Sequence, residues 1–245
     1  MEQQTITKLT SMHLKGMAST YHQDLTTGQL TGETIDGYLA KLADAEWEYR
    51  ANRKIKNLKR AACFRQQAHP HSIDYTIDRN LDKDVLQRLI GLSFLKQSDN
   101  IILTGLTGTG KSYIAQAIGT AACEQGYRTQ YYSMSQLTDT VSAMHLQGNY
   151  PKWIKKTQKI PLLILDDFGL TSIDPQTRKA LMDLIDYRYA KHSTIIASQI
   201  PVSDWHPLIG EATIADAIMD RIVHNAHRLA LTGESMRKHK KVAAL

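Results

Sequence analysis

The sequence predicts an α/β fold, in which a doubly wound, mainly parallel sheet is flanked by helices and preceded by a small all-helical N-terminal domain. Three observations predict it. A glycine-rich loop joins an apolar run to a helical pattern near residue 105, and another uninterrupted apolar run ends in two acids near residue 166. From residue 101 onward, strand patterns alternate with helical patterns, which is the order of a parallel sheet with crossover helices.

The N-terminal part has a helical apolar pattern from about Thr5 to Phe64, with turns expected near Gly28 and Gly32. The segment His69–Ser72 contains a proline and breaks this pattern. A short strand-like stretch from Ile73 to Arg79 and a helix from about Lys83 to Phe94 should follow. We therefore expect a helical domain at 1–68, a linker at 69–80 and a larger domain at 81–245.

In the larger domain, strands are expected at Ile101–Leu103, Thr129–Ser133, Leu162–Asp166 and Ser193–Ser198, with another near Leu229–Leu231. A strand pattern lies between the glycine-rich loop and the acidic pair. This favours the arrangement in which the strands that carry these two motifs are separated in space by another strand. The sequence leaves the order of the strands open.

The glycine-rich loop reads Gly105-Leu106-Thr107-Gly108-Thr109-Gly110-Lys111-Ser112, which matches the P-loop pattern between a strand and a helix. Its glycines permit backbone conformations that a Cβ would penalise, so the loop N–H groups can surround phosphate oxygens. The N-terminus of the following helix favours the same anion. Lys111 should reach the β- and γ-phosphates, and the Ser112 hydroxyl should bind Mg²⁺. The predicted ligand is a nucleoside triphosphate, taken as ATP, with Mg²⁺.

The acidic pair, Asp166 and Asp167, ends the apolar run Leu162–Leu165. Such a run is typical of a strand buried on both faces of a parallel sheet, and acids at its carboxyl end lie where these sheets bind ligands. Asp166 is the expected Walker B carboxylate that holds Mg²⁺ through water. Asp167 is the candidate that orients or polarises the attacking water.

Composition and charge limit the classes of protein. The chain has 245 residues with a net charge of +6, and its two cysteines, Cys63 and Cys123, do not have the spacing of a zinc or disulfide framework. The absence of a long apolar run argues against secretion and membrane insertion, so a cytoplasmic location is expected. One basic run follows several acids on the long N-terminal helix, and we expect it to contact DNA phosphates without reading sequence. The run consists of Arg50, Arg53, Lys54, Lys56, Lys59 and Arg60. The alternative is a solvated helix face.

The motifs together resemble the IstB family, AAA+ ATPases that assist the transposase of certain bacterial insertion sequences. The resemblance covers nearly the whole chain and is carried by the P-loop, Leu162–Gly169, Ala197–Trp205, Ala217–His227 and Gly233–Lys238. It implies that the protein forms an ATP-dependent homo-oligomer, binds duplex DNA and has a transposase as its partner. It also implies a C-terminal lid that is reduced, since the chain ends soon after Arg237.

The resemblance implies three further roles. Gln199 matches the sensor I position, Arg221 the arginine finger that reaches the ATP of the adjacent subunit, and Arg237 the sensor II arginine. Many AAA+ proteins have Glu where this chain has Asp167, so slow ATP hydrolysis is expected.

Simpler roles stay open for these three residues. Arg221 would then form a helix-surface ion pair with Asp220 or Asp216, Gln199 would cap a strand end, and Arg237 would belong to a solvated tail. Two other functions also stay open for the chain. A DnaC-type helicase loader would share the ATPase core but prefer single-stranded DNA, and a small-molecule P-loop kinase would be a monomer.

Overall fold

The chain forms two compact units, Met1–Asn57 and Leu58–Leu245. The computed structural model describes residues 2–28, 34–236 and 238. The first unit ends within a helix, eleven residues before the expected end of the helical domain at 68. It ends there because Ala62 and Ala68 are already buried in the larger unit.

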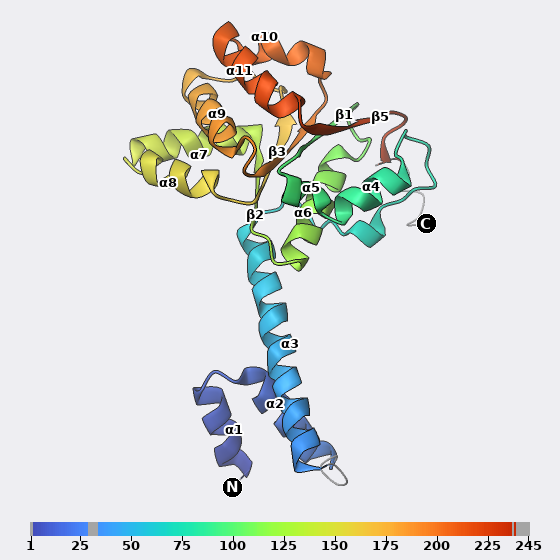
Figure 1. Ribbon diagram of the computed structural model, residues 1–245, viewed down its shortest axis with the longest axis vertical. Coiled ribbons are helices and arrows are strands. Elements are labelled where there is room, and N and C mark those ends of the chain that lie inside the picture. The colour runs from blue at the N-terminus through green and yellow to red at the C-terminus, as the bar shows by residue number, and fades with distance from the viewer. Residues whose placement is uncertain (1, 29–33, 237, 239–245) are drawn as a thin grey trace. The chain divides into compact units, whose positions relative to one another are not determined.

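The N-terminal unit is built from helices (Figure 1). Its helices are α1 Glu2–Ser11, α2 Lys15–Thr27 and α3 Ile35–Ala61, the last of which continues past Asn57 into the larger unit. At Gly16, a Cβ would lie 2.4 Å from the Ala45 carbonyl oxygen, so the close crossing of α2 and α3 requires glycine there. Beside this crossing the buried carboxylate of Glu46 accepts hydrogen bonds from the N–H groups of Gly16 and Met17, at 2.7 and 3.3 Å. Glu46 therefore satisfies backbone donors at the start of α2 that have no intrahelical partner.

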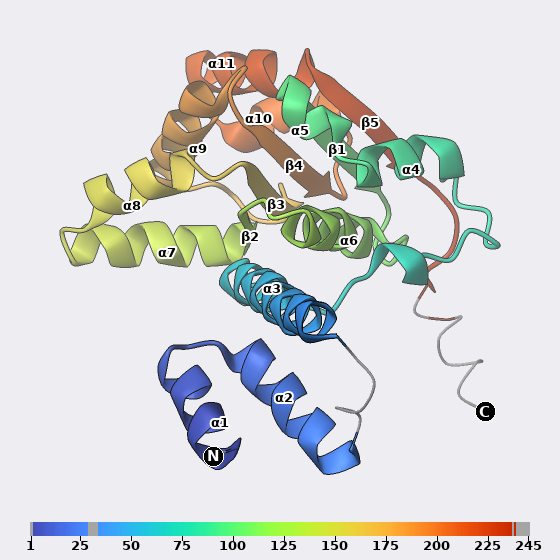
Figure 2. The same cartoon turned by 60° about the horizontal axis from the view of Figure 1, so that its bottom comes forward.

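The larger unit is an α/β domain around a five-stranded parallel sheet, as predicted (Figure 2). The strands are β1 Asn100–Gly105, β2 Thr129–Ser133, β3 Leu162–Phe168, β4 Ser193–Ser198 and β5 Ala226–Leu231. Their order is β2-β3-β4-β1-β5. The strands of the P-loop and of the acidic pair are thus separated in space, as expected, and β4 is the strand between them.

Helices cover both faces of the sheet, and each face has its own apolar core. One core contains Leu86, Phe94 and Ile118 from α4, α5 and α6. The other contains side chains of the helices from α7 to α11, among them the fully buried Trp205. The helices of this unit are α4 Lys83–Ile90, α5 Ser93–Gln97, α6 Lys111–Glu124, α7 Met134–Leu146, α8 Tyr150–Gln158, α9 Pro175–Arg188, α10 Trp205–Ile209 and α11 Ala212–Val223.

The segment before the sheet differs from its sequence-based prediction. The stretch expected as a linker begins with a 3₁₀ turn at Pro70–Ser72 and then buries Ile73 in the first core, so it is an integral part of the larger unit. Ile73–Arg79 does not form a strand. Instead, the side chains at its two ends, Ile73 and Arg79, are buried in the larger unit. The single helix expected at 83–94 is divided into α4 and α5, since Leu92 adopts a left-handed backbone with φ 63°.

Among the described helices, none combines the length and the apolar character that crossing a membrane requires.

Candidate nucleotide site

The P-loop connects β1 to α6 and depends on three glycines with positive φ. Gly105, Gly108 and Gly110 have φ values of 143°, 86° and 99°, where side-chain-bearing residues are strained. All three are also closely approached by other segments, and a Cβ on Gly105 would lie 2.2 Å from the Leu231 carbonyl oxygen of β5. A Cβ on Gly108 would lie 2.1 Å from Ser235 Oγ, and one on Gly110 would lie 2.5 Å from Arg79 Nη1. The loop is therefore packed between the segment before α4 and the segment after β5.

Lys111 folds back over the loop that precedes it. Its side chain is mostly buried, and its ammonium donates to the carbonyl oxygens of Gly105 and Leu106, at 2.7 and 2.9 Å. Burial lowers the pKa of Lys111, and the nearby carboxylates of Asp166 and Asp167 oppose that shift. The ammonium thus lies inside the loop, where a triphosphate would offer it anionic oxygens in place of neutral carbonyls.

Asp166 lies at the end of β3 and is 1% exposed. Its Oδ1 accepts a hydrogen bond of 3.0 Å from Ser112 Oγ, and its Oδ2 accepts one of 2.9 Å from the hydroxyl of Tyr131. Burial and the charge of Asp166 raise the pKa of Tyr131, so this phenol stays a neutral donor. Ser112 and Asp166, predicted separately as Mg²⁺ ligands, are brought together by the sheet. Sequence reasoning missed Tyr131, because nothing in the β2 pattern pairs it with an acid on β3.

Asp167 follows at an irregularity of the sheet. The register between β3 and β4 shifts between Leu165 and Phe168, and Asp167 has a left-handed φ of 58°. Its N–H donates to Asp166 Oδ1 at 2.9 Å, and its own Oδ2 lies 3.4 Å from Nη1 of Arg65. The two adjacent acids therefore have different surroundings, since Asp166 is buried whereas the Asp167 side chain is 30% exposed.

A cleft of about 470 Å³, a size typical of small-molecule sites, lies between the P-loop, Asp167 and the end of β4. Of the predicted residues it is lined by Thr107, Gly108, Gly110, Lys111, Ser112, Asp167 and Gln199. Gln199 comes from the end of β4, and its Oε1 accepts a hydrogen bond from Thr107 Oγ1 at 2.5 Å. Gly105, Leu106, Thr109 and Asp166 do not line the cleft, although the first three belong to the loop itself. Arg237 lies outside the described residues.

Other lining residues were missed by sequence reasoning. They are Arg65, Gln66, Ser72, Ile73, Asp74, Arg79, Tyr113 and Met236. Arg79 shows why: it is 4% exposed, and its guanidinium donates to the carbonyl oxygens of Thr109 and Asp74, at 3.1 and 2.7 Å. It joins the P-loop to a segment 30 residues earlier in the chain. No local pattern marks such a contact.

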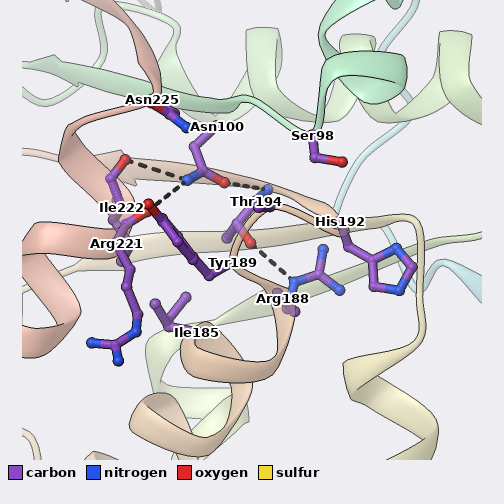
Figure 3. A pocket seen from close by; sticks show the side chains of 11 residues that line it. Ser98, Asn100, Ile185, Arg188, Tyr189, His192, Thr194, Arg221, Ile222 and Asn225 are labelled. Carbon is purple, nitrogen blue, oxygen red and sulfur yellow. Dashed lines mark hydrogen bonds between the residues drawn. The ribbon is translucent and has the colours of Figure 1, made fainter.

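Arg221 lines a pocket together with Asn100 and Thr194, which lie at the amino ends of β1 and β4 (Figure 3). Asn100, the first residue of β1, donates to the carbonyl oxygens of Arg221 and Ile222 at 3.3 Å each and accepts from the N–H of Thr194. The end of α11 is thereby tied to the amino ends of β1 and β4. The P-loop begins at the carboxyl end of β1, about 17 Å away at the usual rise of a strand.

The guanidinium of Arg221 pairs with Asp186 at 2.8 Å and donates to the Ala217 carbonyl oxygen. Asp216 and Asp220, the partners considered from the sequence, pair with His206 and His224 instead.

The basic run of α3 has mixed surroundings. Within their own units, Arg50 pairs with Glu46 and Lys59 pairs with Glu124, each at 2.7 Å. Arg53, Lys54 and Lys56 are exposed, and so is Arg60.

Comparison with protein families matches residues 7–244 to the model of the IstB-like ATP binding protein family. A putative insertion sequence ATP-binding protein of Sinorhizobium fredii, y4pL, is 38% identical over 237 residues, which are 97% of each chain. The putative ATP-binding protein of insertion sequence IS232 from Bacillus thuringiensis is 29% identical over 96% of this chain and 94% of its own.

Among solved structures, DnaI has a TM-score of 0.57 at 19% identity and covers 69% of this chain and 90% of its own. The DnaC helicase loader has a TM-score of 0.51 at 20% identity, over 60% of this chain and 86% of its own. At these identities the likeness concerns the fold alone.

Proposed function

Because the chain belongs to the family of IstB-like ATP-binding proteins, we propose that it is an AAA+ ATPase that assembles on duplex DNA with ATP and recruits or activates a transposase. The observation that carries the proposal is the convergence of Lys111, Ser112, Asp167 and Gln199, which come from three places in the chain, in one cleft. The family match spans both units, so the N-terminal helices belong to the same functional protein.

ATP binding uses the groups of the P-loop. The loop N–H groups and the N-terminus of α6 bind the phosphates, and Lys111 exchanges its carbonyl partners for the β- and γ-phosphates. Ser112 and Asp166 fit Mg²⁺, because a hydroxyl and a buried carboxylate 3.0 Å apart present the oxygen ligands that this ion takes. Mg²⁺ held by these two residues would supply positive charge that neutralises the charge developing during phosphoryl transfer. From the family resemblance, we also propose that Arg237 acts as the sensor II arginine of its own subunit; this residue lies outside the described residues.

Hydrolysis uses Asp167 and Gln199. Asp167 accepts a proton from the attacking water or orients it, and Gln199, whose amide oxygen reaches the P-loop residue Thr107, lies where it can contact the γ-phosphate or that water. The shorter side chain of Asp leaves a longer path to the water than Glu would. Turnover is therefore slow. It is also coupled to assembly, because the arginine finger that completes the site comes from a neighbouring subunit.

Arg221 acts on the ATP of a neighbouring subunit. It lies at the amino edge of the sheet, whereas its own cleft lies beyond the carboxyl edge, so it does not serve the ATP of its own chain. An arginine supplied in this way stabilises the charge of the transition state. ATP then favours the assembled state, because it is bound by groups from two subunits in that state.

DNA is bound through phosphates by the basic run of α3, whose exposed members include Arg53, Lys54 and Lys56. If each subunit neutralised about four phosphates, the logarithm of the binding constant would fall with the logarithm of salt concentration at a slope of about −3.6. A DNA-bound assembly would add such contributions and be very sensitive to salt.

The test is light scattering of the full chain with ATP, ADP or no nucleotide, each with duplex DNA, single-stranded DNA or none. The proposal expects a large particle that requires ATP and grows with duplex DNA, and a Lys111→Ala variant that stays small throughout. Asp167→Asn should assemble with ATP but remain on DNA, because hydrolysis no longer releases it. A preference for single strands would favour a helicase loader, and a monomer in every condition would contradict the arginine-finger mechanism.

A further inference from the structure

Arg79 is a buried arginine that contacts the P-loop from outside the loop. Its side chain is 4% exposed, and its guanidinium joins the carbonyl oxygens of Thr109 and Asp74. Its Nε is also buried and has no hydrogen-bond acceptor among the described residues. Burial lowers the pKa of Arg79, because a desolvated cation is disfavoured, and the charge of Asp74 opposes that shift. A guanidinium is costly to bury, and this one lines the nucleotide cleft although it lies 30 residues before the loop.

The backbone of Arg79 is anchored to the end of β5 rather than to the P-loop. Its carbonyl oxygen accepts a hydrogen bond of 3.0 Å from the N–H of Thr232, the residue that follows β5. The side-chain amide of the next residue, Asn80, donates to the Ala230 carbonyl oxygen at 2.9 Å. The guanidinium therefore reaches the P-loop from a support that lies outside the loop.

The hydrogen bond from Arg79 fixes the direction of one peptide group of the loop. The peptide between Thr109 and Gly110 is trans, so its carbonyl and its N–H point in opposite directions. Because the Thr109 carbonyl is turned toward Arg79, the Gly110 N–H is turned away from it. Within the described part of the chain this N–H has no acceptor, as is usual at the start of a helix, here α6. It is therefore available to a bound anion.

Without such a contact, this peptide group would have little to stop it from rotating. Glycine adopts positive and negative φ about equally well, so Gly110, with φ 99°, tolerates a rotation of the preceding peptide that a residue with a Cβ would resist. The rotated peptide would direct the Thr109 carbonyl oxygen at the phosphates in place of the Gly110 N–H. Inward-pointing N–H groups are what bind an anion in such a loop, so the rotation would weaken the site.

We propose that Arg79 is a positioning residue of the P-loop, which holds the Thr109–Gly110 peptide in the orientation that presents the Gly110 N–H to the phosphates of the nucleotide. The inference rests on the proposed binding of ATP by this loop. It adds a residue outside the P-loop motif to those that set the affinity for ATP. Loss of one hydrogen bond to a charged group lowers affinity by about ten- to hundred-fold, so removal of the guanidinium should raise the Kd for ATP by that factor.

The test measures the Kd for ATP and the Kd for inorganic tripolyphosphate, each with Mg²⁺, for the full-length protein and three variants. The Tm of each ligand-free protein is measured alongside. Arg79→Met keeps the apolar bulk of the side chain and removes the guanidinium. Arg79→Lys keeps the positive charge but lacks the planar fork that reaches both carbonyl oxygens.

Arg178→Met is the matched control. The Arg178 guanidinium also joins two backbone carbonyl oxygens, those of Ile173 and Ile209, but it does not line the nucleotide cleft. This variant should lower Tm without changing either Kd, as any merely structural contact would. Arg79→Met should raise both Kd values by the same factor, because the peptide group acts on phosphates and not on the base. Arg79→Lys should recover little of the lost affinity.

Three results would overturn the inference. They are an unchanged Kd for ATP in Arg79→Met, full affinity in Arg79→Lys, which would show that charge alone is needed, and a loss for ATP without a loss for tripolyphosphate, which would make Arg79 a contact of the base or ribose. Lys111→Ala separates the inference from the proposed function. If Lys111→Ala binds ATP as the parent does, the proposed nucleotide site fails. If it does not bind ATP while Arg79→Met binds as the parent does, only the role of Arg79 fails.

Discussion

Gly108→Ala tests whether the P-loop depends on the contact with the segment after β5. Gly108 has φ 86°, and a Cβ there would lie 2.1 Å from Ser235 Oγ and 2.7 Å from Ser235 Cβ. The Met236 N–H also donates to the Gly108 carbonyl oxygen at 2.9 Å, so the two segments cannot separate without losing a hydrogen bond. The substitution therefore combines a backbone cost with a steric clash.

Gly148→Ala is the matched control, because Gly148 has φ 66° and a Cβ there would have no atom within 4 Å. The left-handed backbone alone costs an alanine about 1–2 kcal/mol. For a domain of this size, that lowers Tm by about 2–8 °C. Gly108→Ala should lower Tm further, since Ser235 must move.

The assay is thermal unfolding with and without nucleotide. A ligand at one hundred times its Kd stabilises the folded state by about 2.7 kcal/mol, which raises Tm by about 5–11 °C. Gly148→Ala should keep this rise and Gly108→Ala should lose most of it, because the displaced loop no longer directs its N–H groups at the phosphates. The reasoning is refuted if Gly108→Ala has the same Tm and the same rise with ATP as Gly148→Ala.

Three further predictions follow from single contacts. Tyr131→Phe keeps the buried ring but removes a hydrogen bond to Asp166, so half-maximal ATP hydrolysis should need about ten-fold more Mg²⁺, and an unchanged requirement would contradict the role of the phenol. Arg221→Ala should bind ATP normally but hydrolyse it poorly, and mixing it with a Lys111→Ala variant should restore partial activity, because an intact arginine then meets an intact P-loop; no recovery in mixtures would argue against action between subunits. Burial raises the pKa of Glu46, but hydrogen bonds from Arg50 and from backbone N–H groups outweigh it and leave the pKa below its usual value. This acid therefore stabilises the N-terminal unit above about pH 4.5, and the contribution is lost as pH falls through the lowered pKa. Hydrogen exchange of α2 amides should report that loss of stability, and Glu46→Gln should show a smaller dependence of this stability on pH. An identical pH dependence in both proteins would exclude Glu46 as the source of the effect.

Much of the fold was accessible from the sequence because its signals are local. The strands at Thr129–Ser133 and Ser193–Ser198 have the predicted bounds, since β-branched and aromatic residues between helical patterns favour strands. The prediction was wrong where a local pattern competed with long-range packing. Ile73–Arg79 alternates between apolar and polar residues as a strand does, yet Ile73 packs in the core and Arg79 donates a hydrogen bond to the P-loop.

The sequence by itself determined the ligand class and the family. The P-loop is one contiguous segment, and its glycines, lysine and serine bind the ligand through the backbone and side chains of that segment alone. The tertiary structure decided which distant groups join that loop. Tyr131 meets Asp166 only because β2 lies beside β3, and Arg65 meets Asp167 only because Phe64 and Gln66 are fixed to α6. It also decided that Arg221 lies at the edge of the sheet opposite its own cleft. Such contacts depend on strand order and helix packing. These arise from the burial of many side chains together, so no spacing of residues in the sequence indicates them.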